Sequence, residues 1–205
     1  MDSVYNLYFN DKDAIIFDLD GTLYDEWDYL SQAYKAISED IKVNFHKNED
    51  EVFQFIISEF QKKGRIKLLS KVIDKFELPV GYLAKTKHIL RNLKVKESIT
   101  CYKQIPGLLK LLQEKNKQLY IITNGNVIQQ KNKISILQSQ NLLKEIYIVY
   151  ADEHIPKPDP AAFNYLMQRF NLKKDSSIMI GDTDTDRDFA QLSGIEFIHI
   201  KEIIT

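Results

Sequence analysis

Two aspartates that follow an apolar stretch near the start of the chain are the first candidates for chemistry. Residues 14–17 (AIIF) are typical of a buried parallel strand, and Asp18 and Asp20 come directly after them. Carboxylates are seldom buried unless they are paired or bind a metal. Because ligands bind beyond the carboxyl ends of the strands in open α/β sheets, both aspartates are candidate site residues.

Three further apolar stretches are followed by polar residues. The stretch QLYIIT ends in Thr123 and continues with Asn124, whose hydroxyl and amide can donate hydrogen bonds to an anion. Lys157 lies between two prolines in HIPKPDP, which restrict the backbone of its loop. The fourth stretch runs into GDTDTD, which contains Asp182 and Asp186. So many carboxylates in one turn repel each other unless a cation or a lysine lies among them.

If these stretches are neighbouring strands, their polar ends meet at one edge of a sheet. Carboxylate oxygens at that edge suit Mg²⁺, which prefers octahedral oxygen ligands; the candidates are Asp18, Asp20 and Asp182. Hydrogen-bond donors and a positive charge suit a phosphoryl group; the candidates are Thr123, Asn124 and Lys157. The pattern therefore predicts a magnesium-assisted site for a phosphate ester.

The strings DLDGT, ITNG, KPDP and GDTDTD, in this order, resemble the four signatures of the haloacid dehalogenase superfamily of aspartate-nucleophile phosphotransferases. The resemblance implies that Asp18 is the nucleophile and that Asp20 is the general acid and base. It implies a metal site made by Asp18, Asp182 and the main-chain carbonyl of Asp20, with Asp186 as a partner of that site or of Lys157. Thr123 and Lys157 would bind the phosphate.

The elements that must position these residues fall into two kinds. From residue 105 onward, strand and helix patterns alternate, which predicts a parallel sheet with helices on both faces. One such helix, over residues 126–140, is predicted to turn Ile128, Ile134 and Leu137 inward. Between residues 24 and 100 only helical periodicity is found, with breaks near residues 44–48, near Gly64 and at residues 79–81.

The predicted fold class is therefore α/β, with a doubly wound, Rossmann-like parallel sheet and an inserted all-helical cap. Residues 1–23 and 101–205 would form the catalytic core and residues 24–100 the cap, which matches the first cap class of the family. Tyr24, Trp27 and Arg65 are the candidate substrate contacts from the cap. For Trp27, a place in the core of the helical bundle is an equally good interpretation.

The expected function is magnesium-dependent hydrolysis of a small phosphate monoester through an aspartyl-phosphate. Asp20 favours phosphate esters, since an alkoxide leaving group needs a proton and the dehalogenase and phosphonate-cleaving members lack this second aspartate. A sugar-phosphate mutase of the same superfamily shares these features, so it remains an alternative. A protein that binds phosphorylated metabolites without turnover is the second alternative.

The resemblance implies a small phosphorylated metabolite as the partner, and the composition points to no other class of partner. The 205-residue chain has a net charge of −1, which gives no case for a dedicated nucleic-acid binder. No apolar run approaches the ~20 residues of a membrane span, and residues 1–13 do not resemble a signal peptide. We therefore expect a cytoplasmic protein, monomeric or homodimeric, with no membrane partner.

Overall fold

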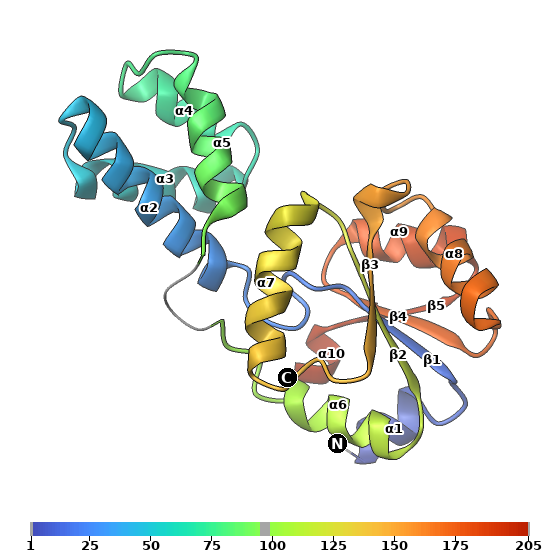
Figure 1. The fold of residues 1–205 in the computed structure, drawn as a ribbon. Coiled ribbons are helices and arrows are strands. Elements are labelled where there is room, and N and C mark those ends of the chain that lie inside the picture. The colour runs from blue at the N-terminus through green and yellow to red at the C-terminus, as the bar shows by residue number, and fades with distance from the viewer. Residues whose placement is uncertain (1, 95–98, 205) are drawn as a thin grey trace. The chain divides into compact units, whose positions relative to one another are not determined.

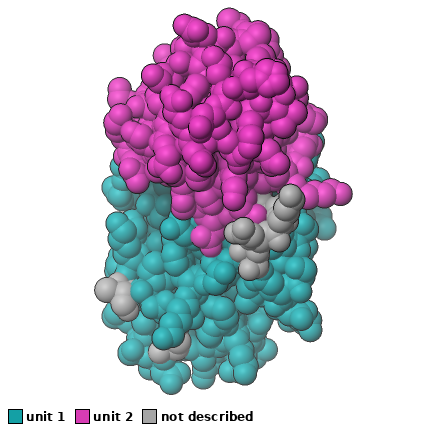
Figure 2. Space-filling view, turned by 90° about the vertical axis from the view of Figure 1, so that its left-hand side faces the viewer, with its two compact units in different colours: residues 1–26, 99–205 teal, residues 27–98 magenta. Residues whose placement is uncertain are grey.

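The computed structural model describes residues 2–94 and 99–204, and the chain divides into two compact units (Figure 2). The sheet unit comprises Met1–Glu26 and Ile99–Thr205, and the helical unit comprises Trp27–Ser98. Tyr24, which the sequence assigns to the cap, belongs to the sheet unit. Residues 95–98, near the predicted end of the insert, lie outside the described residues.

Five parallel strands form one sheet in the order β3-β2-β1-β4-β5 (Figure 1). Their bounds are β1 Ala14–Phe17, β2 Gln118–Thr123, β3 Ile146–Tyr150, β4 Ser177–Gly181 and β5 Glu196–His199. The first strand of the chain is the central one, so later strands add on both of its sides, as in doubly wound folds. The predicted α/β class is confirmed.

The helices of the sheet unit lie on both sides of this sheet, with α8 and α9 on one side and α6 and α7 on the other (Figure 1). Their bounds are α1 Asp2–Tyr8, α6 Ile105–Glu114, α7 Val127–Ser139, α8 Ala161–Phe170, α9 Asp184–Ser193 and α10 Lys201–Ile204, with a short 3₁₀ helix at Ala151–Glu153. The sequence patterns did not predict α1 and α10, which are short and weakly periodic.

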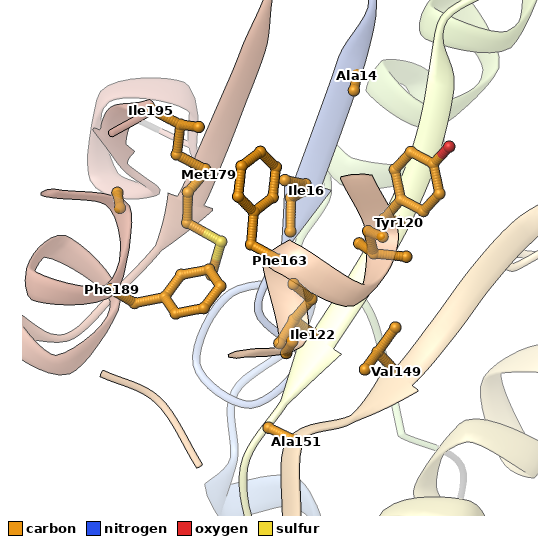
Figure 3. Close-up of a cluster of buried hydrophobic side chains, with 13 residues drawn as sticks. Ala14, Ile16, Tyr120, Ile122, Val149, Ala151, Phe163, Met179, Phe189 and Ile195 are labelled. Atoms are coloured by element: carbon orange, nitrogen blue, oxygen red, sulfur yellow. The ribbon is translucent and has the colours of Figure 1, made fainter. Parts of the chain in front are cut away.

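Successive residues of β1 face opposite sides of the sheet. Ile16 belongs to a buried cluster with Phe163 of α8, Met179 of β4 and Phe189 of α9 (Figure 3). Ile15 and Phe17 are also fully buried but lie outside that cluster, on the other face. Burying side chains of this size contributes roughly 1.5–3 kcal/mol each, which holds helices against both faces.

The helical unit contains four helices among its described residues, separated at the predicted breaks. Their bounds are α2 Trp27–Phe45, α3 Glu49–Lys63, α4 Leu68–Lys75 and α5 Tyr82–Asn92. The side chain of Asn48 accepts a hydrogen bond from the Glu51 N–H and so caps α3, and Gly64, with a φ of 57°, ends that helix. Trp27 packs on Tyr34 and Phe60, with ring centroids 6.1 and 4.8 Å apart.

Among the described residues, no helix has both the length and the apolar character that crossing a membrane would require.

Glu59 ties α3 to α4 by an ion pair. Its Oε2 lies 2.5 Å from the Lys71 ammonium, and its Oε1 lies 3.0 Å from that of Lys62. Hydrogen bonds from Lys71 and then Lys62 lower the pKa of Glu59 to about 2. Because this pKa is depressed, the ion pairs stabilise the folded unit above the ordinary carboxyl pKa of ~4.3, and that contribution is lost as the pH falls towards 2.

We expect Glu59→Gln to lower the protection of α3 and α4 amides against hydrogen exchange at pH 6. The deficit relative to the wild type should shrink as the pH is lowered towards 3, and it should also shrink in high salt. Hydrogen exchange of the full chain measures both effects. A deficit of the same size at pH 6 and pH 3 would contradict a charge-based role.

Candidate active site

A buried lysine joins two of the predicted strand-end aspartates. The Lys157 ammonium lies 2.6 Å from Asp18 Oδ1 and 2.6 Å from Asp186 Oδ1. These residues are 5, 8 and 2% exposed, respectively. A buried charge is tolerated only when it is paired and hydrogen-bonded, so two carboxylates around one ammonium form a mutually dependent set.

Burial and charge shift the pKa values of this set. Burial is the main cause that raises the pKa of Asp18 to about 7; Lys157 opposes this shift and Asp186 adds to it. Burial alone would lower the pKa of Lys157, but the charges and hydrogen bonds of Asp18 and Asp186 outweigh burial and raise it. Lys157 therefore stays an ammonium, whereas a further cation would help to keep Asp18 ionised.

Asn124 fixes the loop that carries Lys157. Its amide nitrogen donates to the Lys157 carbonyl oxygen at 2.9 Å, and its amide oxygen accepts from the Lys157 backbone N–H at 2.8 Å. The sequence predicts phosphate binding by Asn124, but both ends of its side chain bind this backbone. The side chain thus acts as a clamp that connects the end of β2 to the Lys157 loop.

Three carboxylates converge at the ends of β1 and β4. One oxygen from each of Asp18, Asp182 and Asp186 lies within 4.8 Å of the others. Mainly because of burial, and then because of Asp186, the pKa of Asp182 is raised. Three carboxylates this close repel each other when they are all ionised, and a cation between them would offset that repulsion. Their oxygen ligands suit a hard divalent cation such as Mg²⁺.

Asp186 is also part of the local structure of α9. Its Oδ2 accepts from the N–H of Thr183 at 3.1 Å, and its own N–H donates to the Thr183 hydroxyl oxygen at 3.3 Å, which together form a capping box at the start of this helix. Since its Oδ1 accepts from Lys157, Asp186 orients the lysine from a helix end that is itself fixed. This geometry supports the predicted role of Asp186 as a partner of Lys157.

The Asp20 side chain is surrounded by donors from the sheet unit. The Lys133 ammonium lies 2.8 and 2.7 Å from its two oxygens, Gln130 donates to Oδ2 at 2.9 Å, and the Tyr24 hydroxyl donates to Oδ1. Burial alone would raise the pKa of Asp20, but Lys133, with the hydrogen bonds from Tyr24 and Gln130, lowers it. Asp20 is therefore ionised at neutral pH.

Gln130 and Lys133 were missed by the sequence patterns because α7 was expected to turn its aliphatic residues inward. Ile128, predicted to be buried, is 52% exposed, whereas Gln130 and Lys133 are 1 and 0% exposed. The only signal in the sequence is their i, i+3 spacing on a helix that follows a candidate site strand. Hydropathy assigns such residues to solvent, and their hydrogen bonds to Asp20 offset the cost of burying them.

The three candidate substrate contacts of the cap have different surroundings. Tyr24 is fully buried and bonds Asp20, so it is part of the strand-end site rather than of the helical unit. Trp27 packs on aromatic rings within the helical unit, as its alternative interpretation expects. Arg65 is exposed in that unit. For Trp27 and Arg65, contact with a substrate stays a prediction.

The ends of the central strands β1 and β4 carry a cluster of three aspartates, and a buried lysine from the loop after β3 lies between two of them. A family model described as haloacid dehalogenase-like hydrolase matches residues 15–200. The chain therefore belongs to the haloacid dehalogenase-like hydrolases, and the resemblance seen in its four motifs is confirmed.

Curated and solved relatives agree with this membership. A protein from Pyrococcus furiosus named glyceraldehyde 3-phosphate phosphatase is 27% identical over 93% of this chain and 79% of its own length. A HAD-superfamily hydrolase of subfamily IA from Geobacter sulfurreducens covers 94% of this chain and 89% of its own, with a TM-score of 0.68 and 16% identity. The structure of a Bacillus subtilis HAD-hydrolase bound to magnesium matches 91% of this chain and 85% of its own, with a TM-score of 0.64 and 21% identity. These two structures share the fold.

Gly21 is required for the close approach of Asp182. It has a φ of +73°, and a Cβ added there would lie 2.2 Å from Asp182 Oδ2. We expect Gly21→Ala to displace this carboxylate and to weaken Mg²⁺ binding by about 10- to 100-fold, the range typical when the support of a metal ligand is lost. Titration calorimetry with Mg²⁺ measures the effect.

Gly107→Ala is the matched control, because a Cβ at Gly107 meets no atom within 4 Å. This variant should bind Mg²⁺ as the wild type does. Unchanged affinity in a folded Gly21→Ala protein would show that Asp182 does not need its observed position to bind the ion.

Proposed function

We propose that this protein is a magnesium-dependent phosphatase that hydrolyses a small phosphate monoester through a phosphorylated Asp18. The observation that carries the proposal is the buried contact between Lys157 and Asp18 at the end of the central strand, beside Asp182 and next to the strand that ends in Thr123. A carboxylate held by an ammonium is a pre-positioned nucleophile, and the ammonium also attracts a phosphate.

The proposed reaction has two balanced steps. In the first, a carboxylate oxygen of Asp18 attacks phosphorus, the bond from phosphorus to the ester oxygen breaks, and the departing oxygen takes a proton from Asp20. Asp20 is ionised in the free protein and would take up this proton from water when the phosphate dianion binds beside it and raises its pKa. In the second, water attacks phosphorus, gives a proton to Asp20, and the bond between phosphorus and the Asp18 oxygen breaks. The products are an alcohol and inorganic phosphate, and Asp20 returns its proton to water as the phosphate leaves, so both aspartates are regenerated.

The ligands for Mg²⁺ would be the carboxylates of Asp18 and Asp182 and the main-chain carbonyl of Asp20, with Asp186 orienting Lys157. Bound there, Mg²⁺ would offset the negative charge of the carboxylates and of the phosphate oxygens. Thr123, which is 1% exposed, would donate its hydroxyl hydrogen to a phosphate oxygen.

For the substrate we infer a short sugar-like phosphate ester. The support is the name glyceraldehyde 3-phosphate phosphatase, carried by relatives from Pyrococcus furiosus, Pyrococcus abyssi and Methanothermobacter thermautotrophicus at 26–28% identity. In this proposal the helical unit is the cap that selects the ester and excludes water, with Trp27 and Arg65 as candidate contacts.

The test is phosphate release from p-nitrophenyl phosphate and from a panel that includes triose, pentose and hexose phosphates, with and without Mg²⁺. We expect release by the wild type only with the ion. Asp18→Asn should reduce release by roughly 10³-fold or more, since loss of an attacking group commonly costs at least this much. The Asp18 peptide should carry one added phosphoryl group after rapid quenching.

Asp188→Asn is the control, because Asp188 is an exposed carboxylate on α9 with no part in the proposed reaction. It should keep wild-type activity. An isomerised sugar phosphate without free phosphate would contradict hydrolysis and favour the mutase. Full activity of Asp18→Asn would refute the nucleophile.

We also expect Asn124→Ala to lower kcat/KM by up to about 10²-fold, because Lys157 loses both hydrogen bonds that fix its backbone. Steady-state kinetics on p-nitrophenyl phosphate measures the loss. Asn10→Ala, at an exposed position of the same unit, should have no effect. Equal kinetics for the two variants would show that the clamp does not position Lys157.

A further inference from the structure

Lys133 is a fully buried ammonium that the proposed reaction does not use. It reaches from α7 to both oxygens of Asp20, at 2.8 and 2.7 Å, and also lies 3.9 Å from Glu26 Oε1. Its side chain is 1% exposed, so contact with a substrate from solvent is not its role. Burying an ammonium is costly without a partner, which means that Lys133 and Asp20 depend on each other.

Gln130 lies one turn earlier on the same face of α7 and connects Asp20 to Thr123. One nitrogen, Nε2, lies 2.9 Å from Asp20 Oδ2 and 2.5 Å from Thr123 Oγ1. Both oxygens of Asp20 accept from the Lys133 ammonium, so the amide nitrogen of Gln130, and not its oxygen, faces this carboxylate. Both hydrogens of this nitrogen are then used, one for each partner.

This arrangement fixes the direction of the Thr123 hydroxyl. Because the amide nitrogen can only donate, the Thr123 oxygen must accept, and its own hydrogen is left for another acceptor. The acceptor given by the structure is the Asn124 carbonyl oxygen, at a long 3.4 Å. A phosphate oxygen at the end of β2 would be a better acceptor for this hydrogen.

We propose that Lys133 and Gln130 are positioning residues for phosphoryl transfer: Lys133 holds the Asp20 carboxylate, and Gln130 directs the Thr123 hydroxyl hydrogen towards the phosphate. The inference rests on the phosphatase function proposed above. Neither residue is proposed to touch the substrate, and each acts through the side chain that it holds. Their spacing of three residues on one helix lets a single element orient the proton-transfer group of β1 and the phosphate donor of β2.

The test for Lys133 compares Lys133→Met and Lys133→Arg with the wild type on nitrophenyl, phenyl and alkyl phosphates in Mg²⁺. We expect Lys133→Met to lower kcat on the alkyl ester by about 10- to 100-fold, within the roughly 10²–10⁴-fold that a general acid–base contributes. The loss should be smaller on nitrophenyl phosphate, whose leaving group needs little protonation. Lys133→Arg should recover part of the activity because it keeps the charge but not the geometry.

The test for Gln130 is Gln130→Met, which keeps the length of the side chain and removes both donors. We expect weaker competitive inhibition by inorganic phosphate and a higher KM, together with a lower kcat. In Lys133→Met the inhibition by phosphate should stay close to that of the wild type. Lys131→Met is the control for both, since Lys131 lies on α7 with a side chain that is 57% exposed.

A comparison made in the Asp20→Asn variant distinguishes a positioning role of Lys133 from a purely structural one. It also remains possible if Lys133→Met alone does not fold. Asp20→Asn/Lys133→Met removes both charges of the pair, so neither of these two ions is left buried without the other. If Lys133 acts through Asp20, adding Lys133→Met to Asp20→Asn should change kcat on nitrophenyl phosphate by less than about twofold.

Several outcomes would overturn the inference. One is a loss from Lys133→Met that is equal for all leaving groups, or equal with and without Asp20. Another is that Gln130→Met or Lys133→Arg shows the same kcat and KM as the control Lys131→Met. A wild type that releases no phosphate from any ester would instead refute the phosphatase function, and this inference with it.

Discussion

The burial of one ammonium between two carboxylates is the interaction on which the strand-end site depends. Lys157 is charged in the interior only because Asp18 and Asp186 accept from it, each at 2.6 Å. Neither aspartate would be favourable there without it, because an unpaired buried charge typically costs several kcal/mol. The chain therefore brings together a loop after β3, the end of β1 and the first turn of α9 or forms no site at all. Asn124 and the capping box of α9 hold the lysine loop and Asp186 in place for this contact.

The parallel register explains how distant parts of the chain meet at one edge. Phe17 of β1 pairs with Ile121 of β2 and with Ile180 of β4. The residues that follow these three strands therefore lie at the same edge of the sheet. Two glycines let the carboxylates come close: a Cβ at Gly21 would meet Asp182, and one at Gly181 would lie 2.4 Å from the Asp186 Cβ. The resulting concentration of negative charge exceeds what one lysine neutralises, and this excess is the physical reason that the site suits a divalent cation.

Helix α7 provides a second buried ion pair, between Lys133 and Asp20. Lys133 neutralises Asp20 in the same way that Lys157 neutralises Asp18, so each of the two aspartates of the first motif has its own buried lysine. The two environments differ: the pKa of Asp18 is raised to about 7, mainly by burial, whereas that of Asp20 is lowered because Lys133 and two further donors outweigh burial. In the free protein this difference is opposite to what an ionised nucleophile and a protonated acid need, so the proposed reaction requires a cation beside Asp18 and a bound phosphate beside Asp20.

The sequence by itself determined the fold class, the family, and the residues that end each strand, because apolar strands, helical periodicity and four short motifs are local patterns. It also located the breaks between the four helices of the helical unit, where Asn48 and Gly64 act within one turn of the chain. Only the tertiary structure decided that Asn124 clamps the Lys157 backbone, that Tyr24 belongs to the sheet unit, and that α7 turns Gln130 and Lys133 inward in place of Ile128. These features depend on pairing between residues more than 30 positions apart or on the boundary of a compact unit. A polar side chain is buried when a distant partner offsets its desolvation, and no local pattern of hydropathy contains that partner.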